Sequence, residues 1–182
     1  MDSAIEDEST DVVAFLNTLD LDAGRDDLTD VAAFSSWLAG TVDVGRMDVA
    51  ASSLLRARRL RDALRRSARA NHDGEVDHAA LAELDVLSRE LELRPRFGPE
   101  GVVIDSDADG GDGVLGRFLA RAAAAMRDGS WARVKLCADD ACAWAFVDAS
   151  RNRSGRWCSM AGCGNRAKAR AYRSRGSEDR EI

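Results

Sequence analysis

The sequence has 182 residues, enough for one ordinary domain or for one domain with a small appendage. Hydrophobic residues make up 45% and charged residues 32%, which excludes a chain that is disordered over its whole length. The acidic start MDSAIEDESTD has the wrong charge for a signal peptide, and the apolar runs are too short to span a bilayer. We therefore expect a cytoplasmic protein, in whose reducing surroundings structural disulfides are rare.

The net charge of −6 is divided unevenly along the chain. Residues 1–149 carry 17 Lys/Arg and 29 Asp/Glu, whereas residues 150–182 carry nine and three. Between Ser150 and Arg175 there are eight basic residues and no acidic one. This division predicts an acidic body and a basic appendage that could bind a polyanion.

The first part of the chain has the pattern of amphipathic helices. Residues 1–10 form an acidic leader, expected to be disordered, and the first helical spacing follows it at Val12, Val13, Phe15, Leu16 and Leu19. The turn-rich stretch DLDAGRDD ends this helix. Further helices are predicted over Leu28–Ala39 and about Ala50–Ala70, and Asp77 is placed to cap a fourth that runs through Leu91.

The sequence pattern changes after Leu91 and predicts a small hairpin. Both prolines and two glycines interrupt short apolar pieces between Leu93 and Ile104. The stretch DADGGDG is predicted to be a flexible loop, and the alanine-rich segment Val114–Met126 a helix that stops at Gly129. The segment Trp131–Leu136 predicts a short extended lead-in. The body is therefore expected to be mainly α with a minor β-hairpin.

The four cysteines form two pairs with equal internal spacing. Four residues separate the members of each pair, and fifteen separate the pairs: Cys137, Cys142, Cys158 and Cys163. Two such pairs joined by a hairpin-sized connector suit a tetrahedral thiolate site with Zn–S bonds of about 2.3 Å. Zinc is the first choice, and an iron–sulfur cluster is the main alternative, although the spacing does not match the usual cluster runs. A redox pair would need two intervening residues, not four.

The connector and the segment after it complete a recognisable kind of zinc site. Residues Ala143–Asp148 alternate as in a strand, and the loop ASRNRSG precedes a predicted return strand, RWC. Ser159 is a predicted N-cap for a helix from about Met160 to Arg173, which places Cys163 near a helix N-terminus, where the dipole favours a thiolate. A knuckle, a hairpin and a helix that carries the last ligand form a treble-clef type of zinc finger.

These residues resemble a known pair of domains. The stretch from Trp131 to Arg175 is similar to the CGNR zinc finger, with Cys163-Gly164-Asn165-Arg166 as the naming motif. FLNTLD and FSSWLAG, in the helical part, resemble the ABATE domain that precedes this finger. The resemblance implies an ABATE-like domain over residues 11–130, a finger over 131–176, a tail over 177–182, and a stress-induced transcriptional regulator. Gly155 departs from the family, which commonly has a second arginine there.

A zinc ion with four cysteine ligands has no open coordination position, so function is expected from the surface that the finger displays. The candidate nucleic-acid contacts are Arg151, Arg153, Arg156, Arg166, Lys168, Arg170, Arg173 and Arg175. We predict a DNA-binding transcriptional regulator that works mainly through phosphate contacts. Its helical domain is expected to form a homodimer or to sense a small-molecule or protein effector. The alternative is a zinc-stabilised adaptor that binds an acidic protein surface.

Two assignments in the finger stay open. Arg166 either contacts DNA or pairs with Asp148 and orients the hairpin. The aromatic residues Trp144, Phe146 and Trp157 either stack on bases or form the miniature core of the finger, and the core is favoured.

The remaining motifs argue against other functions. Asp105, Asp107 and Asp109 have calcium-loop spacing, but Gly116 stands where a bidentate glutamate is required, so a solvated loop is expected. The sequence contains no nucleophile elbow, phosphate loop or dinucleotide fingerprint. We therefore expect that the protein is not an enzyme.

Overall fold

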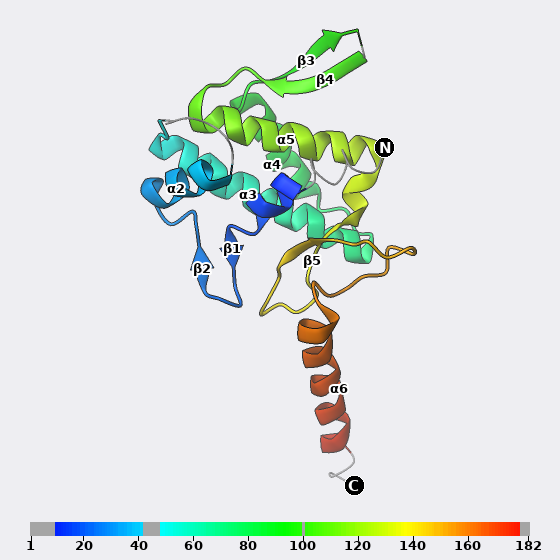
Figure 1. The fold of residues 1–182 in the computed structure, drawn as a ribbon. Coiled ribbons are helices and arrows are strands. Elements are labelled where there is room, and N and C mark those ends of the chain that lie inside the picture. Colours follow the sequence, from blue (N-terminus) through cyan, green and yellow to red (C-terminus); the bar gives the residue numbers. More distant parts are fainter. Residues whose placement is uncertain (1–9, 42–47, 100, 179–182) are drawn as a thin grey trace.

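A computed structural model describes residues 10–41, 48–99 and 101–178, with only the backbone described for residues 73 and 174–178. The predicted leader, apart from Thr10, and residues 179–182 of the predicted tail lie outside these ranges. Of the described residues, those of 10–130 are mostly helical and include two two-stranded antiparallel hairpins. A third antiparallel strand pair and a last helix follow. Figure 1 shows one body of packed helices from which a hairpin and the last helix project.

The helical body is built around one long central helix. Its helices are residues 10–16, α2 (Val31–Thr41), α3 (Ala51–Asp73), α4 (His78–Glu90) and α5 (Gly110–Asp128). Helix α3 packs against α4 and α5 and against strand β5 (Val134–Leu136) of the finger. The predicted helices are confirmed with small shifts at their ends, and Asp77 caps α4 by accepting a hydrogen bond from the Ala80 N–H at 2.9 Å.

The core is aromatic where residues 10–16, α2 and α5 meet. Phe15 stacks on Phe118 with ring centroids 5.0 Å apart, and Trp37 packs at a tilt against both rings. Leu60 and Leu64 of α3 are fully buried beside them. Burial of these large side chains is the main stabilising term of the body.

Helix α5 begins four residues earlier than the sequence predicts, because Gly110–Gly113 are helical instead of forming a loop. A Cβ at Gly113 would lie 2.4 Å from the Ala108 carbonyl oxygen, and one at Gly116 would lie 2.3 Å from the Ser106 Oγ. Glycine is therefore needed here for close packing of the helix on the end of strand β4.

The hairpins differ from expectation in two places. Strands β3 (Leu93–Gly98) and β4 (Gly101–Ser106) form the predicted hairpin, which projects from the body beyond α5 (Figure 1). A hairpin of β1 (Leu19–Asp20) and β2 (Arg25–Asp26) occupies the stretch that the sequence marks only as turn-rich.

In the finger, β6 (Ala145–Val147) pairs with β5 (Val134–Leu136), the predicted extended lead-in. The prediction of a return strand at RWC is wrong. The segment is not a strand, and among the described residues its backbone makes one hydrogen bond to another backbone group: the Ala138 N–H donates to the Arg156 carbonyl oxygen at 2.8 Å. Strand β5 is buried throughout, and its Lys135 pairs with the buried Asp148 directly after β6, which makes this segment the better partner for β6.

No helix within the described ranges is both long enough and apolar enough to cross a membrane.

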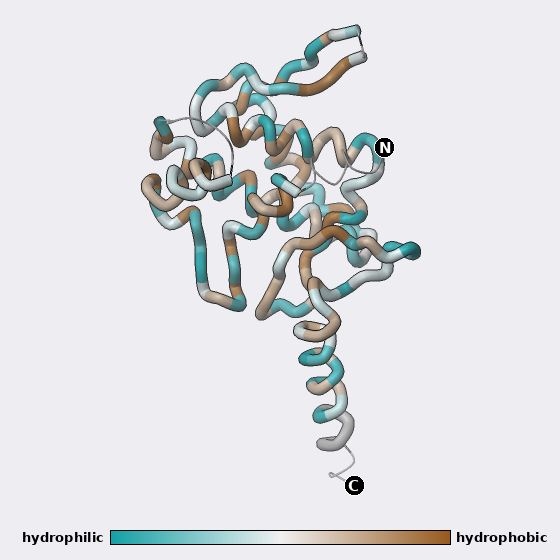
Figure 2. The backbone as a smooth tube through the Cα atoms, in the orientation of Figure 1, coloured by the Kyte–Doolittle hydropathy of each residue, from teal (hydrophilic) through white to brown (hydrophobic). Residues whose placement is uncertain are grey.

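After β6, a short π-helical turn, η2 (Met160–Gly164), leads directly into α6 (Asn165–Glu178). The helix predicted at about Met160 to Arg173 is thus confirmed and extends five residues further. Figure 2 shows that the projecting α6 carries teal, hydrophilic positions along its length, whereas the middle of β4 is brown and the helices of the body alternate between teal and brown.

Candidate metal centre

The four cysteines meet at one point. Their Sγ atoms all lie within 4.8 Å of one another, and the sulfur of Cys158 lies 3.7 Å from that of Cys142 and 3.6 Å from that of Cys163. Zn–S bonds of about 2.3 Å put the sulfurs of a regular tetrahedron roughly 3.8 Å apart, whereas a disulfide needs about 2.05 Å. The four free thiols therefore have the spacing of a ligand set, and one Zn²⁺ fits between them.

Backbone hydrogen bonds shape the first cysteine pair. The N–H of Cys137 donates to the Trp144 carbonyl oxygen at 2.8 Å, directly after β5. The N–H groups of Cys142 and Ala143 both donate to the Asp139 carbonyl oxygen at 2.8 Å, which closes a tight turn between the two ligands. Ala143 leaves this turn with a φ of 45°, in the left-handed region that costs non-glycine residues energy.

The second pair is held by a helix cap. The Ser159 Oγ accepts a hydrogen bond from the Gly162 N–H at 3.2 Å, as the sequence predicts for an N-cap. Cys163 is buried in the turn that follows. The glycine of the CGNR motif is also explained, because a Cβ at Gly164 would lie 3.0 Å from the Met160 Sδ and 3.3 Å from the Trp157 ring.

The protonation of the thiols also fits a metal site. Burial raises the pKa of Cys142 to about 11 and raises that of Cys158 further, and the neighbouring sulfurs add to the effect on Cys158. Burial also opposes ionisation of Cys137, but backbone N–H groups outweigh it and lower the pKa of this thiol. Four thiolates in one buried cluster repel one another, and a divalent cation at their centre offsets that repulsion and displaces the protons.

Arg166 belongs to the metal centre. Its Nη2 donates to the Cys163 Sγ at 3.0 Å, its Nε lies 3.2 Å from Asp139, and its Nη1 lies 3.5 Å from Asp22 of the β1–β2 turn. The predicted pairing of Arg166 with Asp148 is therefore wrong, because the carboxylates that Arg166 contacts are those of Asp139 and Asp22. The carboxylate of Asp139 raises the pKa of Arg166, which stays charged and partly balances the thiolates.

Asp148 instead holds the hairpin loop. Its buried carboxylate accepts hydrogen bonds from Lys135 Nζ at 2.9 Å and from the N–H groups of Ser150 and Gly155 at 2.9 and 2.8 Å. A Cβ at position 155 would lie 2.6 Å from the Asp148 Oδ1. The departure from the family at Gly155 therefore coincides with a close approach between backbone and carboxylate that a larger residue would disturb.

The aromatic side chains pack around the metal centre. Trp144 and Trp157 are partly buried against the cluster of Cys137, Cys142 and Cys163. Phe146 is also partly buried. The position of Trp144 and Trp157 supports the interpretation that they form the core of the finger.

The predicted nucleic-acid contacts fall into two groups. Arg166 and Arg170 both pair with Asp139, at 3.2 and 3.3 Å. Five others are exposed and have no recorded ion pair among the described residues: Arg151, Arg153, Arg156, Lys168 and Arg173. For Arg175 the side chain lies outside the described part. The five unpaired cations lie in the loop after β6, which projects sideways from the finger, and on α6, which projects away from the helical body (Figure 1).

Polar side chains of the helical body fasten the finger to it. The Asn17 side-chain amide exchanges two hydrogen bonds with the Ala145 backbone at 3.0 and 2.8 Å. The buried Arg65 donates to the Leu16 and Ala143 carbonyl oxygens at 2.8 and 2.9 Å. Asn71 donates to the Trp131 and Val134 carbonyl oxygens, each at 2.8 Å. Sequence reasoning missed all three, because their partners are backbone atoms more than 45 residues away.

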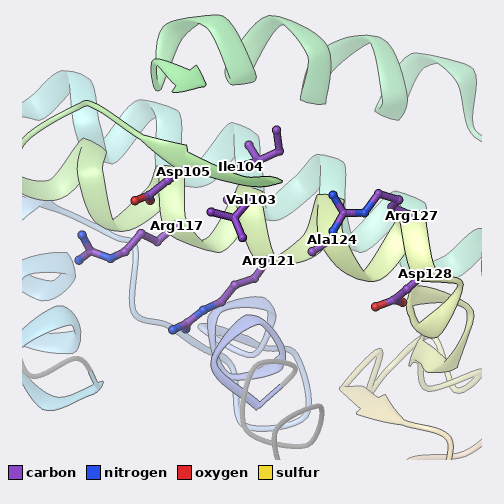
Figure 3. A pocket seen from close by; sticks show the side chains of 9 residues that line it. Val103, Ile104, Asp105, Arg117, Arg121, Ala124, Arg127 and Asp128 are labelled. Atoms are coloured by element: carbon purple, nitrogen blue, oxygen red, sulfur yellow. The ribbon is translucent and has the colours of Figure 1, made fainter. Parts of the chain in front are cut away.

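The helical body has a hollow of its own, on the far side of the body from α6. About 340 Å³ in volume, it lies between β4 and α5, with Val103 at one wall and Arg117, Arg121 and Arg127 along the helix (Figure 3). Arg121 also pairs with Asp11. The hollow thus combines an apolar wall with guanidinium groups and with the carboxylates of Asp105 and Asp128.

The aspartates of the calcium-like loop do not gather. Within the described ranges, the four cysteines form the only group of potential metal ligands close enough to hold an ion. Asp107 pairs with Arg94 and Arg96 of β3. The solvated-loop interpretation is therefore supported over a calcium site.

Comparison with known families agrees with this architecture. The sequence profile of the CGNR zinc finger matches residues 133–176. The profile of ABATE, a family described as "Putative stress-induced transcription regulator", matches residues 12–130. A search among curated proteins finds no match.

Proposed function

The chain belongs to the ABATE family and ends in a CGNR zinc finger, and we propose on this premise that it regulates transcription by binding duplex DNA through its finger. Zinc would hold the finger in shape, and the contacts would be made mainly to phosphates. Neither family is one of enzymes.

The observation that carries the proposal is the set of five unpaired cations on the finger. They are exposed, they lie on elements fixed by the metal centre, and no acidic residue occurs between Ser150 and Arg175. Among the other arginines that the structure describes, most have an ion pair, as Arg59 has with Glu83 and Glu90. Cations left free on a rigid element can neutralise phosphates and release counterions, which is the main source of affinity for DNA.

The helical domain would supply what one small finger lacks. Dimerisation through this domain would raise the effective concentration of the second finger on the same duplex. The exposed hairpin tip, where Phe97 is 83% accessible, offers apolar surface for such a contact. The arginine-lined hollow beside α5 is where an anionic effector would bind.

The proposal is tested by binding to a fluorescently labelled duplex of random sequence, followed by anisotropy between about 50 and 200 mM salt. Replacing Arg151, Arg153 and Arg156 together by glutamine removes three phosphate contacts, so the slope of log K against log salt becomes shallower by about 3. Arg89→Gln is the matched control, because Arg89 is an exposed arginine of α4 that pairs only with the exposed Asp85 among the described residues.

The adaptor alternative makes a different prediction for the same proteins. A finger that recognises acidic protein surfaces should bind a labelled polyglutamate peptide and leave the duplex unbound at low salt. That result, in zinc-loaded protein, would contradict the proposed DNA binding.

A further inference from the structure

Helix α6 leaves the body after its first turn and runs free into solvent (Figure 1). From Asn165 to Arg173 every residue is exposed except Ala167, which is half-buried. Ala171 is among these exposed residues. A free helix of 14 residues is only marginally stable in water, so this exposure suits an element that gains its contacts from a partner.

The cations of α6 are distributed around the helix and do not form a single stripe. At about 100° per residue, Lys168 lies about 160° from Arg170 and about 140° from Arg173. The exposed Tyr172 lies about 40° from Lys168. Between these two sides are small residues, Ala167, Ala169 and Ala171. The helix is therefore slim and carries positive charge on two sides.

Such a helix is poorly suited to a flat partner. A flat acidic surface can contact only one side, which would leave either Lys168 or Arg173 facing solvent. A groove with negatively charged walls contacts both sides at once. The major groove of B-DNA is about 12 Å wide, close to the 10–12 Å diameter of a helix, and phosphates line both of its edges.

We propose that α6 enters the major groove of duplex DNA, with Lys168 and Arg173 bound to the phosphates of opposite strands. This inference rests on the proposed function and specifies how the finger is oriented. Arg166 and Arg170 stay beside Asp139 at the base of the helix. The loop that carries Arg151 and Arg153 leaves the finger in a different direction from α6 and would contact the flanking backbone (Figure 1).

Dimethyl sulfate tests this orientation on duplex saturated with zinc-loaded full-length protein. The reagent methylates guanine N7 in the major groove and adenine N3 in the minor groove, so one experiment reports on both. The inference predicts that methylation at N7 falls while methylation at N3 is unchanged.

Two single variants complete the test. Lys168→Gln and Arg173→Gln should each lower affinity roughly tenfold at about 0.1 M salt, and each should make the salt slope shallower by about 1. Arg89→Gln should change neither value. Equal zinc content in all proteins shows that the finger is intact.

The outcomes separate the two levels of the proposal. If the protein binds duplex but N7 stays reactive, or if only one of the two variants weakens binding, α6 does not occupy the groove and the orientation is wrong. DNA binding itself would then still stand. If the wild-type protein binds no duplex at low salt, the proposed function fails, and the orientation fails with it.

Discussion

At the scale of single residues, the metal centre depends on every one of its cysteines. Replacing Cys163 by serine removes a buried thiolate, so we predict that zinc content falls from about one ion per chain to well below half. The finger should unfold locally, while the helical body, which has its own core, keeps its helical signal. Elemental analysis and circular dichroism of purified protein measure both. A full complement of zinc in this variant would contradict a four-thiolate site.

A second residue-scale prediction concerns the buried pair of Lys135 and Asp148. Asp148→Asn leaves the Lys135 charge without its partner, which should destabilise the finger by roughly 3 kcal/mol. Burial alone would raise the pKa of Asp148, but hydrogen bonds from Ser150 and Lys135 outweigh it and hold this pKa well below its usual value. A lowered pKa stabilises the folded state above the ordinary value of about 3.9, and this stabilisation is lost as the pH falls below it.

The pH dependence makes that prediction specific. The difference in Tm between the wild type and Asp148→Asn should be largest near about pH 6 and should shrink toward about pH 3. Lys135→Arg is the control, because it keeps a cation beside the carboxylate. A Tm difference that is independent of pH would show that the charge of Asp148 is unimportant.

Residue-scale prediction from sequence succeeded where the spacing alone decides the chemistry. The cysteine spacing predicted that the four cysteines gather in one cluster, which the structure confirms, and Ser159 was recognisable as a cap. The partner of Arg166 was not predictable, because it depends on β6 pairing with β5, which brings Asp148 to Lys135 and leaves Asp139 to Arg166. Which carboxylate meets which cation follows from the fold and not from local pattern.

At the scale of elements, α3 is the support of the finger. Its sequence predicts an amphipathic helix with arginines on the polar side, yet Arg61 and Arg65 are buried. Arg61 pairs with Asp26 of β2, and Arg65 bonds to carbonyl oxygens, one of them next to the zinc ligand Cys142. Burial and the charge of Arg61 lower the pKa of Arg65. The burial of such an arginine cannot be predicted from the local hydrophobic pattern, because its partners are backbone carbonyl groups of distant segments.

The support by α3 can be tested with a matched pair of variants. Arg65→Met keeps an unbranched apolar stem but removes the guanidinium group, so the Leu16 and Ala143 carbonyl oxygens lose their donor. We predict a loss of about 2 kcal/mol or more in unfolding free energy. Arg69→Met, one turn further along α3, removes only an exposed pair with Asp140 and should cost less than about 1 kcal/mol.

Chemical denaturation and the rate of zinc transfer to a chelator measure the two effects. The turn after Cys142 should loosen in Arg65→Met, so zinc should leave faster than in Arg69→Met. Equal stability and equal zinc release in the two variants would show that α3 does not support the metal centre.

At the scale of the whole molecule, the division into a helical part and a finger was predictable from composition and cysteine spacing. The way in which the two parts are joined was not, because Asn17, Arg65 and Asn71 reach across the chain to finger backbone. The start of the finger, up to β6, is therefore bonded to the helical domain, whereas α6 projects away from that domain (Figure 1). A molecule built in this way presents its unpaired cations outside the part of the finger that is bonded to the helical body.

The central claim is that these unpaired cations bind DNA phosphates, and the salt dependence of binding to random duplex measures it most directly. Five phosphate contacts predict a straight line of log K against log salt with a slope of about −4 to −5 for the zinc-loaded protein. Zinc-free protein should show a much shallower slope, because its finger no longer holds the cations together. A slope near zero, or no binding at low salt, in the zinc-loaded protein would contradict the claim.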